Sequence, residues 1–128
     1  MPPHPLRRWS LPVAVYVVIL TLSSIPGDAL AGTPGWTAVA GHAAGYGLLA
    51  WAIHRAWDGK AAGLVAITAA LVLGLVNELQ QGLVAGRSPD VADLGVDGLG
   101  ALAGVLVRCL RPRRPGSRPP GRGSAARR

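Results

Sequence analysis

The chain has 128 residues, which is one domain at most; half of them are hydrophobic and 15% are charged. Its net charge of +7 would suit a nucleic-acid-binding protein, but eight of the thirteen basic residues lie from Arg108 onward. No aromatic or folded reading element accompanies this stretch, so we expect no nucleic-acid partner. Cys109 is the single cysteine, which excludes an intramolecular disulfide.

The charges lie at the chain ends and in loops, with long uncharged runs between them, which is typical of a membrane protein. Four apolar runs predict four membrane-crossing helices, over residues 11–24, 37–57, 61–84 and 92–110. At about 1.5 Å per residue the last three reach roughly 28–36 Å, enough for a hydrocarbon core of about 30 Å. The first reaches roughly 21–24 Å and needs Trp9 and its neighbours to complete the crossing.

The predicted fold is therefore all-α. We expect a compact four-transmembrane-helix bundle over residues 1–110, followed by a basic tail over residues 111–128. The tail mixes arginine with Pro, Gly and Ser, a composition that predicts disorder and contact with anionic lipid headgroups.

Two glycine patterns support a compact bundle. Gly41-(x3)-Gly45 and Gly100-(x3)-Gly104 place small residues on one helix face, where helix backbones can approach closely. In a chain so rich in Gly and Ala they are weak indications of a dimer, so the oligomeric state stays open.

The basic residues predict the orientation in the membrane. With a cytoplasmic N-terminus, twelve of the thirteen fall on the inner side and Arg87 alone falls outside. The positive-inside rule therefore predicts a multi-pass protein of the bacterial cytoplasmic (inner) membrane with both termini cytoplasmic.

A cleaved secretory signal is the alternative for the first apolar run. Arg7-Arg8 would be its basic region, residues 11–22 its apolar region, and Ala29-Leu30-Ala31 its A-x-A cleavage site. Removal would leave three spans with an outside N-terminus, which the remaining charges also permit. Charge alone leaves both readings open.

Most of the unusual polar chemistry falls on three predicted helices at one depth, roughly 5–14 Å below the outer boundary. Each helix carries two polar residues at a spacing of three or four, so each pair shares a helix face. A short connection over residues 85–91 adds an arginine that can fold back over the carboxylates. The candidate binding residues are His42, Tyr46, Glu78, Gln81, Arg87, Asp93 and Asp97.

Several carboxylates beside one Arg and one His cannot all be charged away from water, so an acid is protonated, a cation is bound, or solvent enters. A metal site is possible by residue type at His42, Glu78, Asp93 and Asp97. No His or Cys pair at ligand spacing supports it, so we assign no metal and no cofactor. Acid–base chemistry by Glu78 with His42 stays open, and no catalytic residue is assigned.

The same residues form a family pattern. Its parts are Leu22-Ser23-Ser24-Ile25-Pro26-Gly27, then His42 and Tyr46, then Glu78 and Gln81, Gly86-Arg87, and finally Asp93, Asp97 and Gly100. In these motifs, over about residues 11–107, the chain resembles the VanZ-like family of small bacterial membrane proteins, some of which are linked to teicoplanin resistance.

Two departures from the family pattern concern charge. An Asp-Lys pair that often precedes the histidine is replaced by Ala38-Val39, and the usual Asn is Asp97. The resemblance implies a retained first helix, a place in the cell envelope, and a link to susceptibility to lipid-tailed glycopeptides. It implies no particular reaction.

We therefore expect an envelope protein with a polar, outward-facing pocket that binds a lipid headgroup or envelope precursor, or modulates glycopeptide access. An intramembrane enzyme acting on a lipid-linked substrate through Glu78 and His42 is the first alternative. A structural or assembly partner without a ligand is the second.

Overall fold

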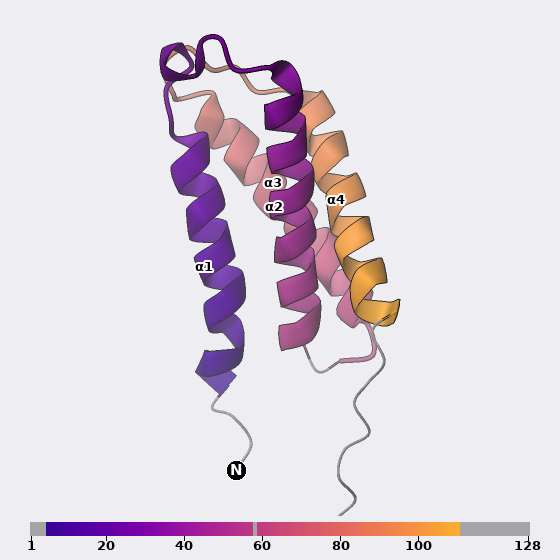
Figure 1. The fold of residues 1–128 in the computed structure, drawn as a ribbon. Helices are drawn as coiled ribbons and strands as arrows, with labels where there is room; N and C mark the ends of the chain where they lie inside the picture. Colours follow the sequence, from indigo (N-terminus) through magenta and orange to yellow (C-terminus); the bar gives the residue numbers. More distant parts are fainter. Residues whose placement is uncertain (1–4, 58, 111–128) are drawn as a thin grey trace, which may run out of the picture.

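The computed structural model describes residues 5–57 and 59–110, which form four α-helices and one turn of 3-10 helix (Figure 1). The elements in chain order are α1 (Pro5–Ser23), the 3-10 turn η1 (Asp28–Leu30), α2 (Gly35–Ala56), α3 (Ala62–Gln81) and α4 (Val91–Leu110). No strand occurs among these residues, so the all-α prediction is confirmed. The basic tail expected over residues 111–128 lies outside the described part.

Two helix boundaries differ from the apolar runs by three residues or more. α1 spans Pro5–Ser23 and so already includes the residues that precede the apolar run at residue 11. α3 ends at Gln81 rather than at residue 84, where the chain continues in tighter turns: the Leu83 amide donates to Gln80 O and the Val84 amide to Gln81 O. The polar end of α3 is therefore a true helix terminus.

α2 is the central helix and packs most extensively against α4. Gly100 and Gly104 of α4 make this possible, because a side chain at either would collide with the backbone of α2, at Ala43 and Gly47 respectively. The small-residue pattern predicted on α4 thus allows close packing between two helices of the same chain. On α2, Gly41 faces open space and Gly45 faces Ile19 of α1.

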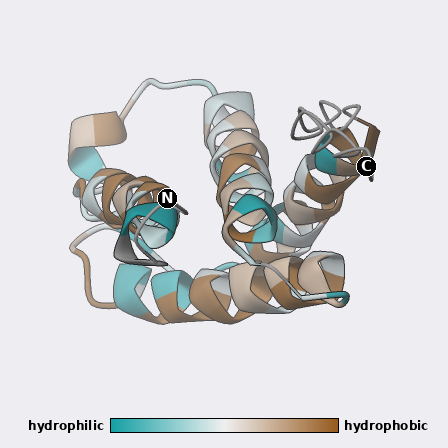
Figure 2. Cartoon of the chain, turned by 90° about the horizontal axis from the view of Figure 1, so that it is seen from below, coloured by the Kyte–Doolittle hydropathy of each residue, from teal (hydrophilic) through white to brown (hydrophobic). Residues whose placement is uncertain are grey.

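Small residues make up much of the interior, while large apolar residues lie outside. The buried hydrophobic residues packed together are Tyr46, Leu49, Ala50, Ile53, Ala66, Ala70, Ala101 and Val105. Four polar side chains of α3 and α4 are buried with them: Asn77, Glu78, Gln81 and Asp97. Leucine and valine side chains are exposed along all four helices, and Figure 2 shows brown, hydrophobic residues on outward-facing surfaces.

One helix within the described ranges, α3, is long and apolar enough to cross a membrane by length and composition. Four such helices were expected. α4 carries Asp93, Asp97 and Arg108, α1 includes Arg7 and Arg8, and α2 is rich in glycine and alanine, which lowers the apolar character of each.

Two loops are joined at one end of the bundle. The Gly27 amide, after α1, donates to Ala85 O, in the α3–α4 connection, at 3.0 Å. A side chain at Gly27 would collide with the Gly86 carbonyl, and Gly86 has a φ of 70°, a conformation that favours glycine. Together, Gly27, Ala85 and Gly86 form what we call the loop clasp, which ties the end of α1 to the segment between α3 and α4.

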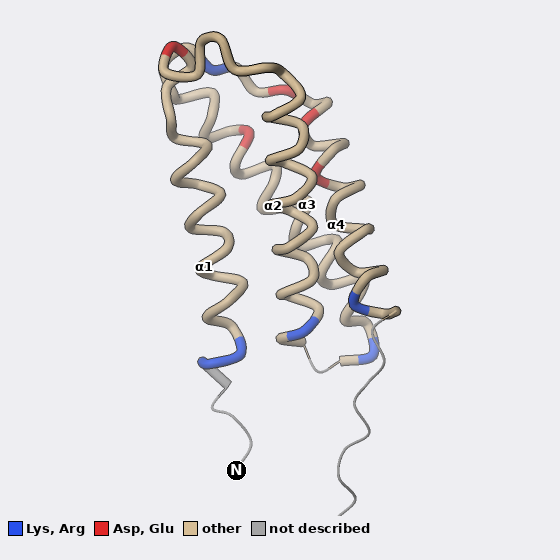
Figure 3. The backbone as a smooth tube through the Cα atoms, viewed as in Figure 1, with Lys and Arg blue, Asp and Glu red and all other residues tan. Residues whose placement is uncertain are grey.

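Charge is divided between the two ends of the bundle. In Figure 3 the acidic residues of the described chain lie at the end that carries the loop clasp, and most of its Lys and Arg residues lie at the opposite end. The exception is Arg87, in the α3–α4 connection. At the basic end Trp9 of α1 and Trp57, just after α2, meet edge to face with ring centroids 6.2 Å apart.

Candidate functional site

His42 of α2 lies between two aspartates of α4. Its Nδ1 is 2.8 Å from Asp97 Oδ1, and its Nε2 is 3.7 Å from Asp93 Oδ2. The spacing of four residues puts both aspartates on one face of α4, and the glycine contacts described above bring that face against α2. Asp97 is completely buried, whereas Asp93 is partly exposed.

Gly74 of α3 makes the space for the Asp97 carboxylate. A Cβ atom at Gly74 would lie 2.7 Å from Asp97 Oδ2. The glycine is one turn before Glu78 on the same helix face, so the three helices meet around this carboxylate. Gly74 could not be identified from the sequence, because a lone glycine within an apolar run gives no indication of what it faces.

Glu78 is held by the start of α4. Its Oε2 accepts a hydrogen bond from the Asp90 amide at 2.8 Å, and the side chain is 96% buried, with 4% exposed. Asp90 in turn caps α4, since its Oδ1 accepts from the Ala92 amide at 2.8 Å. The backbone role of Asp90 was missed by the sequence analysis, although a Pro-Asp pair just before an apolar run is a recognisable helix start.

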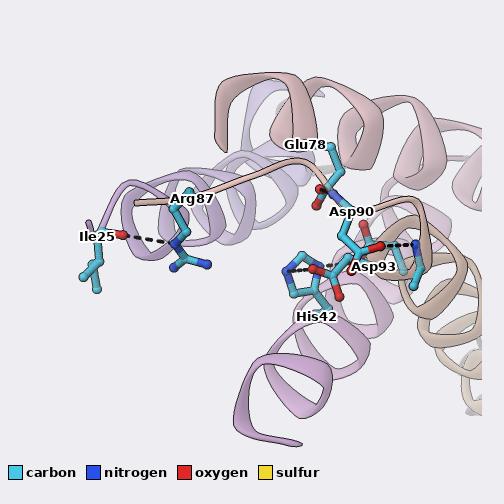
Figure 4. Close-up of polar contacts among 8 residues, drawn as sticks. Ile25, His42, Glu78, Arg87, Asp90 and Asp93 are labelled. Atoms are coloured by element: carbon cyan, nitrogen blue, oxygen red, sulfur yellow. Dashed lines mark hydrogen bonds and ion pairs between the residues drawn. The ribbon is translucent and has the colours of Figure 1, made fainter. Parts of the chain in front are cut away.

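The polar groups of α2, α3 and α4 converge. Each of His42, Glu78 and Asp97 has one nitrogen or oxygen atom able to bind a metal ion, and these three atoms lie within 4.8 Å of one another. Figure 4 shows His42, Glu78 and Asp93 turned toward one another, as the common depth and shared faces predicted. We call His42, Glu78, Asp93 and Asp97 the acid cluster.

Arg87 does not fold over the acid cluster, and this part of the prediction is wrong. Its Nε donates instead to Ile25 O at 3.2 Å, and within the described chain it forms no ion pair with a carboxylate. Figure 4 shows it directed away from the cluster. The loop clasp explains the difference, because it holds the residue before Arg87 against the end of α1.

Arg87 instead lines a cavity of about 660 Å³ between α1 and α2. The walls are mainly apolar side chains, such as Val15, Val18 and Ile19 of α1 and Leu48 of α2. Its polar lining residues are Ser23, Thr33, Thr37, His42, Tyr46, Gln81 and Arg87. The cavity therefore borders the acid cluster through His42.

Tyr46 and Gln81 belong to this cavity rather than to the ionic contacts. The Tyr46 ring stacks on His42 with centroids 6.2 Å apart and is 1% exposed. Gln81 is 2% exposed. The Tyr46 hydroxyl and Gln81 Nε2 are buried and have no hydrogen-bond partner among the described residues. Two hydrogen-bond donors are thus available beside the cavity.

Asn77 adds a further unsatisfied group. It is completely buried, and neither its Nδ2 nor its Oδ1 has a partner in the part of the chain that is described. It adjoins Glu78 on α3, and the sequence analysis left it out of the candidate site. Buried amides without partners are rare and point to a bound water or ligand.

Comparison of the chain with family models, curated proteins and solved structures found no match.

Proposed function

We propose that this chain is an integral protein of the bacterial cytoplasmic membrane that binds an amphipathic envelope molecule with an anionic headgroup at its outer end. In this proposal all four helices cross the membrane and both termini are cytoplasmic. The observation that carries the proposal is the cavity between α1 and α2, which has mainly apolar walls and is lined by Arg87.

The distribution of polar and apolar side chains supports a membrane location. Large apolar residues such as Leu64, Leu79, Leu99 and Leu110 are more than 60% exposed, while Asp97 is completely buried. A water-soluble monomer rarely exposes apolar surface so widely. In a bilayer this arrangement is favourable, because lipid covers the apolar faces and small residues pack the helices together.

The division of charge supports the orientation. Apart from Arg87, basic residues gather at one end of the described bundle and acidic residues at the other (Figure 3). The positive-inside rule assigns the basic end to the cytoplasm. The loop clasp, the acid cluster and Arg87 then face outward, where envelope lipids and their precursors present headgroups.

The chemistry of the cavity fits a lipid. Its volume is within the range of roughly 300–1,000 Å³ that small-molecule sites occupy. Arg87 uses its Nε for Ile25 O, and its two terminal nitrogens have no hydrogen-bond partner among the residues described. A guanidinium edge of this kind pairs well with a phosphate, while the apolar walls suit an acyl chain. Gln81, another lining residue, has a buried Nε2 without a hydrogen-bond partner in the described chain.

Lipid extraction tests the proposal. The full-length protein is purified from a bacterial host in mild detergent, and co-purifying lipids are identified by mass spectrometry. We expect anionic phospholipid with the wild type and at least about tenfold less with Arg87→Gln, since a charge-assisted hydrogen bond contributes about 1.5–3 kcal/mol. Lys60→Gln removes an exposed positive charge at the opposite end and should retain the lipid.

A second variant tests the cavity without altering charge. Gly41 lines the cavity, and a Cβ atom there meets nothing within 4 Å, so Gly41→Leu should direct its side chain into the cavity. We expect it to lose lipid while α2 stays folded. Equal lipid content in wild type, Arg87→Gln and Gly41→Leu would reject lipid binding in this cavity and favour a scaffold without a ligand.

Acid–base catalysis on a lipid-linked substrate is the second candidate. The contact of 2.8 Å between His42 and Asp97 supports it, because a carboxylate can orient an imidazole for proton transfer, and His42 also lines the cavity. Glu78→Gln separates the two functions. An enzyme would accumulate bound, unconverted lipid in this variant, whereas a binding protein would carry the same lipid species as the wild type.

The resemblance to the VanZ-like family suggests antibiotic susceptibility as the cellular phenotype to measure. We propose that expression changes susceptibility to lipid-tailed glycopeptides such as teicoplanin, and that Arg87→Gln abolishes the change. The inhibitory concentration in strains expressing equal amounts of wild type and variant is the measurement.

A further inference from the structure

The carboxylates of the acid cluster lack a sufficient counter-charge. Asp97 is completely buried, Glu78 is 4% exposed, and Asp93 lies beside the same imidazole. Arg87, the expected counter-charge, is bonded to Ile25 O. Within the described residues, His42 is the one group capable of positive charge that contacts these aspartates. A layer with three carboxylates and one imidazole is therefore costly to bury as it stands.

We propose that the acid cluster binds one divalent cation of the Zn²⁺ or Mn²⁺ type through His42, Glu78 and Asp97. One donor atom from each of these residues lies within 4.8 Å of the other two, on three different helices. One imidazole nitrogen with two carboxylate oxygens is a donor set that suits these ions. Three protein ligands would leave a coordination position open, as in many metal sites that bind a water or a substrate.

The distances require a small adjustment. Ligand atoms about 2.1 Å from a tetrahedral ion lie about 3.4 Å from one another. His42 Nδ1 and Asp97 Oδ1, at 2.8 Å, are already closer than this, so the ion would separate them slightly. A separation of 4.8 Å would need to close by about 1.4 Å. Rotation of Glu78 supplies this movement, because its Oε1 has no partner while its Oε2 stays on the Asp90 amide.

Two independent features favour a bound ion over a simple group of acids. Glu78 and Asp97 are each more than nine-tenths buried. Even so, Glu78 Oε1 and Asp97 Oδ2 have no hydrogen-bond partner in the described chain. With Nδ1 of His42 on the ion, its Nε2 would face Asp93. A metal-bound histidine commonly donates its other N–H to a carboxylate in this way.

The experiment uses the full-length protein in detergent, purified with a tag that contains no histidine and stripped with EDTA. Binding of Mn²⁺ is followed by electron paramagnetic resonance, and binding of Zn²⁺ by competition with a chromophoric chelator. We expect one ion per chain. Asp97→Asn and Glu78→Gln, which preserve side-chain shape, should each weaken binding at least about tenfold. Asp28→Asn makes the same chemical change at an exposed position in η1, outside the acid cluster, and should bind as the wild type does.

Nitrogen coupling gives a measurement that does not depend on the variants folding. Pulsed spectra of bound Mn²⁺ in the wild type should contain the coupling of one imidazole nitrogen. Three results would each overturn the proposal: no saturable binding, an affinity in Glu78→Gln and Asp97→Asn equal to that of the wild type, or bound Mn²⁺ without nitrogen coupling. Protons would then neutralise the cluster. Because no lipid is added, either result leaves the lipid-binding proposal to its own test.

Discussion

The acid cluster depends on a single residue, Gly74, because this position has no side chain. The Asp97 carboxylate occupies the place where a side chain of α3 would otherwise lie. An acidic residue is costly to bury in a bundle of apolar helices, and it is retained here beside His42, at a hydrogen-bonding distance of 2.8 Å. Stability and site geometry are therefore linked at this glycine.

Gly74→Ala tests that link. The added Cβ would lie 2.7 Å from Asp97 Oδ2 and 3.2 Å from Leu94 Cδ1, so the carboxylate must move. We expect the free energy of unfolding to fall by about 1–3 kcal/mol, as overpacking does elsewhere. Denaturation in detergent micelles provides the measurement.

Gly95→Ala is the matched control for this substitution. Gly95 also lies inside a helix, but a Cβ there meets nothing within 4 Å. Alanine is the better helix former by about 1 kcal/mol, so this variant should be as stable as the wild type or more stable. Two variants of equal stability would show that Asp97 adapts without cost.

At the scale of elements, two close approaches of backbone shape the bundle. α4 lies on α2 through Gly100 and Gly104, and the loop clasp joins the end of α1 to the α3–α4 connection through Gly27 and Gly86. The first approach places the aspartates against His42. The second fixes Arg87 beside Ile25 and keeps it out of the acid cluster. Separate contacts therefore position the cavity arginine and the acid cluster.

Gly104→Ala should separate α4 from α2. The new methyl group would collide with the Gly47 carbonyl, which is backbone and cannot rotate away. We expect a loss of at least about 2 kcal/mol in unfolding free energy. Gly41→Ala, in open space on α2, should be tolerated. Unchanged thermal stability of Gly104→Ala would contradict the close helix contact.

Gly27→Ala should open the loop clasp. Gly27 has a φ of −63°, so alanine fits its backbone conformation and the effect is purely steric, against the Gly86 carbonyl. We expect faster proteolysis of the loop after α1 and reduced lipid retention, because Arg87 loses its fixed position. Gly35→Ala, with nothing within 4 Å, serves as the control, and equal proteolysis of the two variants would argue against the clasp.

The helices and the shared polar faces could be predicted from the sequence, because apolar runs and spacings of three or four residues are local patterns. His42 and Asp97 were placed at one depth in this way, and they are in contact. The position of Arg87 could not be predicted, because it depends on contacts between loops about 60 residues apart, as its bond to Ile25 shows. The burial of Asn77 likewise depends on the tertiary packing of α3.

The bundle as a whole carries charges of opposite sign at its two ends and apolar side chains around its sides. With the exception of Arg87, basic and acidic residues of the described chain occupy opposite ends of the bundle, and large apolar side chains cover the sides of the helices. A bilayer accommodates both features, with headgroups at the two ends and hydrocarbon around the middle. The proposed orientation follows from combining them.

Labelling of cysteine tests this orientation with one native and one introduced thiol. Cys109 is exposed near the basic end of α4, and Ser88 is exposed in the α3–α4 connection. In intact cells, a membrane-impermeant reagent should label Ser88→Cys in a Cys109→Ser background. It should label the wild type only after the membrane is disrupted. The opposite pattern would invert the topology.

The pairing of α2 with α4 has a consequence for how the protein is made. His42 and Asp97 are separated by 55 positions, and translation at about 5–20 residues per second takes roughly 3–11 s to cover that distance. During this interval α2 has been synthesised while the helix that covers its histidine has not. Until α4 is made, the His42 imidazole has no aspartate partner from this helix, so the cluster becomes complete only with the last helix.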